Sequence, residues 1–530
     1  MSAIAPVNVG VRLGERTMDV LVTAHRWLGT ALCLVFATWF ASGIVMMYAG
    51  YPLLSEGDKL ARTPPLDLAA AQLTPAEAYR RAGLDSPVDY VRLGTMLDRP
   101  TYFFLTGGSW VAVGADDGTV RPALDADAAL GVARAFEVGE VAPPRYAGLF
   151  ESPDQWTIYT SWAPYLPGHD FSPFHKLEFD DGTEVSVLAA TGDVIQRTTP
   201  SERLWGYLGA VVHWIYPTTF RTRHVDAWND LIVWLSALGT VLCVSGVAIG
   251  IYFFRWRREP GVAGSPYRGW MKWHHWIGLV FGVLAGPWVF SGLMSMDPWA
   301  WSTTDDSPDG AQVDRMSGAL DLDAFVAAPA TAAAACRSQV NTKEIRLVQL
   351  AGVPYYYCSQ APNRSALVAA DGSGAPPFES FAQSALVDAA RAILPGAEIA
   401  SAELLDHYDA YYYPGWEDKL ENGAAKRLPV LKIAFDDVER TLVYVDPYTA
   451  VPVKVYDTSG RWYRWLFHGL HSLDFGALYR SRPLWDLLVL PLMLGGVAVS
   501  VTGAWIGYKW LKRKVRKPKP QKRRTAPVAP

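Results

Sequence analysis

Four long apolar runs constrain this chain more than any other feature. They cover residues 25–48, 229–254, 273–296 and 484–510, and each could cross about 30 Å of hydrocarbon as a helix. A cleaved signal peptide is the alternative for the first run, but its apolar core is too long and begins well inside the chain. The sequence therefore predicts a membrane α-helical bundle with four spans.

Basic residues predict the orientation of this bundle. The loop 255–272 is crowded with them: Arg255, Arg257, Arg258, Arg268 and Lys272. Ten more, and no acid, lie between Lys509 and Arg524, so the tail 511–530 is basic as well. Nucleic acid is the other partner that such a tail suggests, but a position directly after an apolar helix favours a membrane anchor. We therefore expect a bacterial inner-membrane protein that binds no nucleic acid, with segment 1–24 and the tail in the cytoplasm.

The segments 49–202 and 297–460 must then lie on the periplasmic side. Thr74, Pro75 and Glu77 form a typical helix start. Alternating apolar residues predict half-buried strands at 101–105, 176–179, 345–350, 431–435 and 441–445. Both segments therefore read as α+β domains, and each is followed by a short interfacial helix, at 203–220 and 461–476.

The chain is similar to itself in an ordered series of positions. HRWLG at 25–29 recurs as HHWIG at 274–278, and KLEFDD at 176–181 recurs as KIAFDD at 432–437. The Ser-Gly pair 42–43 recurs at 291–292, and Trp39 recurs as Trp288. At an offset of 258, Thr191, Arg203 and His213 fall on Thr449, Arg461 and His471. We infer two parallel repeats, related by a pseudo-two-fold axis along the membrane normal.

The repeat sorts the histidines into two symmetric pairs. His25 and His274 open the first and third spans, whereas His213 and His471 precede the second and fourth. A span of about 24 residues separates His25 from His213 by roughly 30 Å or more, so the pairs must form between the repeats. Each pair could hold one haem b, since imidazole suits haem iron and is costly in a membrane unless it has a partner.

Several alternatives remain open for these residues. Any one histidine could instead bond to a lipid headgroup or a carbonyl, and His275 or His468 could replace its neighbour as the ligand. Bare zinc or copper would leave an incomplete coordination sphere. Trp39 and Trp288 either line the gap between two haems or pack in the core.

Two further groups in the outer segments carry possible chemistry. Cys336 and Cys358 either form a disulfide or remain thiols. An acidic and aromatic segment either binds a ferric chelate or forms an ordinary domain edge; its candidate residues are Asp406, Tyr408, Asp409 and Tyr412. His169 and His175 have no counterpart in the second repeat, so we do not expect them to be ligands.

The HRWLG and HHWIG openings, the turn VDPYT at 445–449 and GLHSLDF at 469–475 resemble the PepSY-associated transmembrane family of bacterial iron-regulated membrane proteins. The resemblance covers nearly the whole chain. It implies PepSY-like outer domains, haem in the bundle, and reduction of ferric siderophores. It transfers best to His25, His274, His213 and His471.

Three functions therefore stand at this point. The first is a two-haem reductase that passes electrons to a periplasmic ferric siderophore; a separate cytoplasmic reductase or a quinol must supply them, since no dinucleotide or flavin motif is present. The second is a PepSY receptor without redox chemistry. The third is an iron or solute transporter, which is disfavoured because no span carries an acid at mid-depth.

Overall fold

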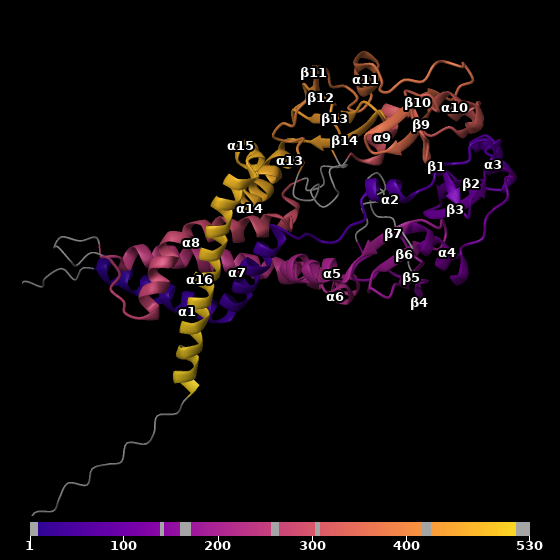
Figure 1. Cartoon of the computed structure of the whole chain (residues 1–530). Helices are drawn as coiled ribbons and strands as arrows, with labels where there is room; N and C mark the ends of the chain where they lie inside the picture. Colours follow the sequence, from indigo (N-terminus) through magenta and orange to yellow (C-terminus); the bar gives the residue numbers. More distant parts are fainter. Residues whose placement is uncertain are drawn as a thin grey trace, which may run out of the picture.

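The computed structural model describes residues 9–137, 142–158, 171–255, 264–302, 308–414 and 426–515. Within these residues, four helices are long and apolar enough to span a membrane. They are α1 (Val9–Met46), α7 (Val225–Phe253), α8 (Trp270–Met294) and α16 (Arg482–Val515). In Figure 1 these helices lie together as a bundle, and the strands form a lobe beyond one end of it. The prediction of a four-span helical bundle is confirmed.

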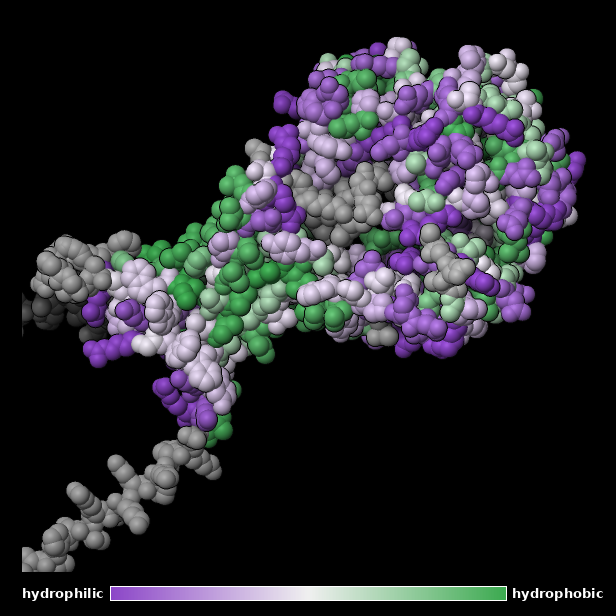
Figure 2. All heavy atoms as spheres, viewed as in Figure 1, coloured by the Kyte–Doolittle hydropathy of each residue, from purple (hydrophilic) through white to green (hydrophobic). Residues whose placement is uncertain are grey.

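The bundle is held together by close helix contacts. Helix α1 packs against α7 and α16, and α8 packs against the same two helices. Glycines permit this approach: a Cβ added at Gly496 would lie 2.6 Å from the ring of Phe40, and one at Gly239 would clash with Phe36. Figure 2 shows hydrophobic residues over the outside of the bundle and hydrophilic ones over much of the lobe.

One antiparallel sheet joins the two halves of the chain. Its strands are β1 (Val88–Met96), β2 (Arg99–Thr106), β3 (Ser109–Gly114), β8 (Glu344–Leu350), β9 (Val353–Ala361) and β10 (Arg364–Ala369). Their order is β10-β9-β8-β1-β2-β3, and the halves meet where Arg92 lies opposite Arg346. The two outer segments are therefore joined through a common sheet, which the sequence did not predict.

Two four-stranded sheets complete the lobe. The first contains β4 (Arg145–Phe150), β5 (Phe174–Glu178), β6 (Glu184–Leu188) and β7 (Val194–Thr198). The second contains β11 (Ile399–Leu405), β12 (Val430–Phe435), β13 (Leu442–Asp446) and β14 (Val451–Tyr456). Each is an antiparallel meander, with α4 (Ala126–Phe136) packed on the first and α11 (Gln383–Ala390) in the core of the second.

The predicted outer strands all form, but two are more buried than expected. Residues 101–105 in β2 are all buried, as are most of β8. The reason is that the shared sheet is covered on both faces: Tyr102 and Phe104 belong to one core, and Phe103 belongs to another. Strands covered in this way lose the alternation that a half-buried strand shows.

Short helices cap and connect these layers. The predicted start at Thr74 is confirmed, since Thr74 and Glu77 form a capping box for α3 (Pro75–Arg81). Other short helices are α2 (Glu56–Arg62), α6 (Thr218–Arg223), α15 (Gly476–Arg480), η2 (Pro298–Ala300) and η3 (Leu322–Ala324).

A further pair of short helices, α9 (Gly310–Ser317) and α10 (Pro329–Cys336), forms part of a bent stretch that is also apolar enough to span a membrane. Its residues Met316, Phe325 and Cys336 are buried in the cores of the lobe, so we assign the stretch to the lobe. Cys336 and Cys358 lie in the same core, and both are free thiols.

Two helical connectors lead from the lobe into the bundle. The first is α5 (Pro200–Gly206) followed by a π-helical turn, η1 (Tyr207–Val211). The second is α13 (Thr458–Tyr463), followed by a π-helical turn, η4 (Arg464–Gly469), and by α14 (Leu470–Ser472). π-helical turns are rare and are frequent at functional sites. Here each ends two residues before one histidine of the outer pair, His213 or His471.

Candidate functional site

The structure brings His213 and His471 together at the lobe end of the bundle. Their ring centroids lie 6.0 Å apart, and the ring planes are inclined by 70°. Both lie outside the spanning helices. Burial lowers the pKa of each imidazole to about 4, so both are neutral at pH 7, the form that binds metals.

A hydroxyl group from the bundle orients each of these rings. Nδ1 of His213 lies 3.2 Å from Oγ of Ser42 and 3.1 Å from the Trp39 carbonyl oxygen. Nδ1 of His471 lies 3.0 Å from Oγ of Ser291. In the described residues neither Nε2 makes a hydrogen bond, so the Nδ1 contacts fix the ring while leaving Nε2 available to a ligand.

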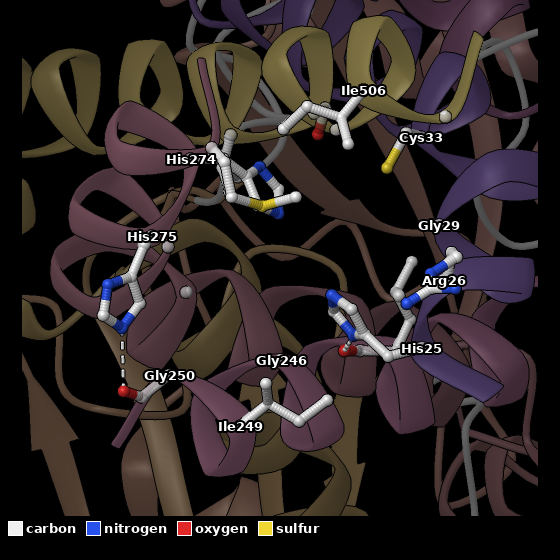
Figure 3. Close-up of a pocket in the computed structure, with 18 of the residues that line it drawn as sticks. His25, Arg26, Gly29, Cys33, Gly246, Ile249, Gly250, His274, His275 and Ile506 are labelled. Carbon is white, nitrogen blue, oxygen red and sulfur yellow. Dashed lines mark hydrogen bonds between the residues drawn. The ribbon is translucent and has the colours of Figure 1, made fainter. Parts of the chain in front are cut away.

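The inner pair lines a cavity of about 740 Å³ between the four spanning helices. Figure 3 shows His25 and His274 on different walls of this cavity. Nδ1 of His25 lies 3.1 Å from Oγ of Ser245, and Nδ1 of His274 lies 3.0 Å from Oγ1 of Thr502. The same kind of contact therefore orients all four rings.

A glycine follows each of these four hydroxyl residues and lies against the same imidazole. A Cβ added at Gly246 would lie 2.7 Å from Cε1 of His25, and one at Gly503 would lie 3.2 Å from Cε1 of His274. At the outer pair the corresponding distances are 3.5 Å for Gly43 and 3.8 Å for Gly292. Each histidine thus rests on a Ser-Gly or Thr-Gly dipeptide of a neighbouring helix.

These supporting dipeptides were only partly visible in the sequence. Ser42-Gly43 and Ser291-Gly292 belong to the recurring positions, although no role could be assigned to them. Ser245-Gly246 and Thr502-Gly503 also recur, at an offset of 257, and this signal was missed. Only their position on the helices facing the histidines shows what they do.

The other histidines make different contacts. His275 is buried and uses both ring nitrogens, 2.8 Å from Oγ of Ser265 and 2.8 Å from the Gly250 carbonyl oxygen, so it turns away from the cavity centre (Figure 3). His468 contacts the rings of Tyr463 and Phe467.

In the lobe, both ring nitrogens of His175 are bonded, to the Tyr146 hydroxyl and the Leu124 carbonyl oxygen. The expectation that His175 is not a ligand stays a prediction. His169 lies outside the described residues, as do Arg257, Arg258 and the tail beyond residue 515.

Aromatic side chains connect the two pairs. Phe36 and Phe40 line the inner cavity, and the rings of Phe40 and Trp288 have centroids 6.0 Å apart. Nε1 of Trp288 donates a hydrogen bond of 2.8 Å to the carbonyl oxygen of His471. Trp39 packs against Phe36 and accepts at its own carbonyl from His213. Both tryptophans therefore pack in the bundle and also contact the outer pair.

The acidic and aromatic segment of the lobe is largely used for packing. Asp409 accepts hydrogen bonds from Nζ of Lys432 at 2.7 Å and from the Tyr444 hydroxyl at 2.8 Å. Tyr412 is buried and stacks on Tyr444. The hydroxyl of the half-buried Tyr408 donates to the Lys426 carbonyl oxygen. Among the four candidates, Asp406 is the one whose side chain is almost fully exposed.

Comparison with known proteins adds one finding to this geometry. No curated protein matches the chain. A family model described as the PepSY-associated TM region matches residues 22–513, and thus includes all four histidines, the four spanning helices and the lobe. Because this match covers nearly the whole chain, the protein belongs to the family of the PepSY-associated TM region.

Proposed function

We propose that this protein is an inner-membrane b-haem protein that passes electrons across the membrane to a periplasmic ferric siderophore. The observation that carries the proposal is the set of four histidines, two at each end of the bundle, each oriented through Nδ1 by a hydroxyl group. The haem iron would be held by His213 with His471 at the outer site and by His25 with His274 at the inner site.

The outer pair fits a shared iron. Two imidazoles that share one metal ion, at metal–nitrogen distances of about 2.0 Å, have ring centres within roughly 6 Å of each other. The ring centroids of His213 and His471 are 6.0 Å apart. A bare metal ion fits less well, because the described residues contain no group of three or more His, Cys, Asp or Glu side chains that could hold one.

The inner pair fits a flat organic cofactor. Its cavity of about 740 Å³ falls within the roughly 300–1,000 Å³ of ordinary cofactor pockets. Eight of the residues that line it are glycines, namely Gly29, Gly246, Gly250, Gly269, Gly278, Gly282, Gly503 and Gly507. At these positions a planar ring system can lie close to the helix backbone, because glycine has no side chain.

When bound, haem would supply reversible one-electron transfer. The chain's own residues would hold the iron, keep the imidazoles neutral and oriented, and exclude water between the two sites. The buried cluster of Phe36, Phe40 and Trp288 serves the last purpose. Trp288 also contacts His471 of the outer pair, because its Nε1 donates a hydrogen bond to the backbone carbonyl oxygen of that residue.

The proposed orientation follows from charge. Basic residues lie around the end of the bundle that carries the inner cavity, among them Arg26, Arg268 and Arg513. By the positive-inside rule this end faces the cytoplasm, so the lobe is periplasmic. A cytoplasmic reductase or a quinol would donate electrons to the inner site. Within the acidic segment, the exposed Asp406 and the half-buried Tyr408 remain the candidates for contact with the ferric chelate.

We further infer that the chain contains two pseudo-symmetric helix–PepSY–helix repeats. Equivalent residues make equivalent contacts: Lys176 pairs with Asp154, and Lys432 pairs with Asp409. Arg203 donates a hydrogen bond to the carbonyl oxygen of Gly182, in the turn between β5 and β6. Arg461 donates one to the carbonyl oxygen of Arg440, in the corresponding turn between β12 and β13. Such recurrence at matching positions supports a common ancestral unit.

The test is a reduced-minus-oxidised absorption spectrum of the detergent-purified protein, with haem quantified per chain. We expect b-type bands and about two haems, one for each histidine pair. His213→Ala or His471→Ala should each remove one haem, whereas His407→Ala, an exposed histidine of the lobe, should remove none. Absence of haem from protein produced in haem-replete cells would overturn the proposal and favour a PepSY receptor.

A further inference from the structure

The inner cavity is strongly asymmetric in charge. Four basic residues line it: Arg26, Arg268, Lys509 and Arg513. No aspartate or glutamate is among its described lining residues, and most of the rest are apolar or glycine. All four basic residues are exposed, so an anionic group of a ligand can reach their charges.

The basic residues come from the ends of three different segments. Arg26 adjoins His25 on α1, and Arg268 directly precedes α8. Lys509 and Arg513 are one turn apart near the end of α16. In Figure 3 Arg26 lies beside His25 at the cavity wall. The four positive charges therefore gather at one end of the cavity.

These cations lack acidic partners in the part of the chain that the structure describes. The guanidinium of Arg26 lies over the ring of Trp510, at 5.8 Å from its centroid. The ammonium of Lys509 lies over the ring of Trp505, at 4.8 Å. Neither of these residues, nor Arg268 or Arg513, forms an ion pair among the described residues. Their charges are thus available to an anionic ligand.

We propose that these four residues bind the carboxylates of the inner cofactor. The inference rests on the proposed function, since haem b is a flat apolar ring with two carboxylates on one edge. The apolar and glycine-lined walls would receive the ring, His25 and His274 the iron, and the basic residues the carboxylate edge. Arginine suits this role because its planar fork donates two parallel hydrogen bonds to a carboxylate. Bound in this way, the carboxylate edge would face the end of the bundle that carries these basic residues.

The competing explanation is that these residues only anchor the bundle to lipid phosphates. The chain offers a matched control for it. Lys512 and Lys514 lie on the same last turns of α16 but do not line the cavity. The ammonium of Lys512 contacts the Tyr508 hydroxyl, and that of Lys514 lies over Trp27. Anchoring to lipid phosphates depends on how many positive charges this end of the bundle carries. Binding of the cofactor carboxylates depends on whether the charged residues line the cavity.

The experiment compares Arg26→Gln/Arg513→Gln with Lys512→Gln/Lys514→Gln in the full-length protein. Each double variant removes two positive charges. The measurement is the rate at which inner-site haem transfers to an excess of a haem-scavenging apoprotein, with His213→Ala as the background so that a single haem is followed. We expect transfer about tenfold faster or more in the arginine variant and unchanged transfer in the lysine variant.

A second measurement keeps the inference testable if the arginine variant does not fold. The His213→Ala protein, with all four basic residues intact, is reconstituted either with haem or with haem dimethyl ester, which lacks both negative charges. Faster loss of the ester than of haem supports the carboxylate site. Equal loss of the two ligands, or equal effects of the two double variants, would overturn it. Failure to bind either ligand would instead contradict the proposed function.

Discussion

At the scale of single residues, one arrangement occurs four times. In each case a histidine ring lies against a Ser-Gly or Thr-Gly dipeptide of a neighbouring helix. The hydroxyl fixes the ring through Nδ1, and the glycine leaves room for the ring to lie against the helix. If the histidines bind haem as proposed, these partners would orient the ligands and raise their basicity. The hydroxyl residues would then belong to the proposed site as much as the histidines do.

Removing such a hydroxyl should weaken the site without altering its shape. Thr502→Val replaces the hydroxyl that contacts Nδ1 of His274 by a methyl group. We expect about 10–100-fold weaker haem binding at the inner site, measured by titration of the cofactor-free protein. Thr240→Val is the control, because the Thr240 hydroxyl bonds only within α7, to the carbonyl oxygen of Ser236. Equal effects of the two substitutions would contradict the role given to Thr502.

Filling the space beside an imidazole should be more damaging. In Gly246→Ala the new methyl group would lie 2.7 Å from Cε1 of His25, so the ring must move. We expect loss of the inner haem and a fall from about two haems per chain to about one. Gly286→Ala on α8 is the control, since its nearest contact would be an ordinary 3.7 Å. Full haem content in Gly246→Ala would show that the site does not need this close approach.

At the scale of elements, a buried ion pair positions the connector that carries His471. Arg464 in η4 donates to Asp474 at 2.8 Å, and both side chains are almost fully buried. Arg464 also bonds to the Ala410 carbonyl oxygen in the lobe. The pair therefore joins η4, which precedes His471, to the segment that follows His471, and Arg464 links both to the lobe.

Breaking this pair should destabilise the protein and its outer site together. Arg464→Met leaves Asp474 buried without its cation, which typically costs about 3–5 kcal/mol. Urea unfolding followed by tryptophan fluorescence measures the loss, and the outer haem should be lost before the inner one. Arg464→Met/Asp474→Leu should recover most of the stability, since an apolar pair replaces the ionic one. No recovery in the double variant would show that Arg464 acts mainly through its bond to Ala410.

At the scale of the whole molecule, a buried ionic network joins the two halves of the chain beside the shared sheet. Asp193 pairs with Lys59 at 2.9 Å and with Arg92, and Arg92 lies 3.5 Å from Glu344. Glu344 in turn pairs with Arg346 at 3.0 Å. Lys59, Arg92 and Asp193 belong to the first half of the chain. Glu344 and Arg346 belong to the second half, so the network holds the two halves of the lobe together.

This network predicts an acid dependence of stability. Burial alone would raise the pKa of Asp193, but Arg92 and Lys59 outweigh it and hold the pKa below its ordinary value. A carboxyl group with a lowered folded-state pKa stabilises the fold above its unfolded value, about 3.9, and this stabilisation is lost as the pH falls through the lower folded-state pKa.

The melting temperature of the full-length protein and of Asp193→Asn should therefore differ most near neutral pH. The difference should hold from pH 7 to about 4 and then shrink as the pH falls from the unfolded value of about 3.9 through the lower folded-state pKa. A difference that stays constant over this range would show that the charge of Asp193 does not contribute. Asp89→Asn, at an exposed position of β1, controls for general effects of losing an acid.

Much of the fold could be predicted from the sequence because its signals are local. Four apolar runs of sufficient length determine four spanning helices, and the capping residues at Thr74 determine where α3 begins. The strands at 176–179 and 431–435 were visible from their alternation. The recurring positions also predicted which histidines face each other, since helix length excludes the other pairing; their role as haem ligands stays a prediction.

Only the tertiary structure decided how these elements meet. The pairing of β1 with β8 joins strands about 250 residues apart in the sequence, and hydrogen bonds between distant backbones leave no local pattern. Burial of both faces of β2 follows from that pairing, as does the ionic network around Arg92. The roles of Ser245 and Thr502, and the burial of Tyr412, likewise depend on neighbours that only folding brings into contact.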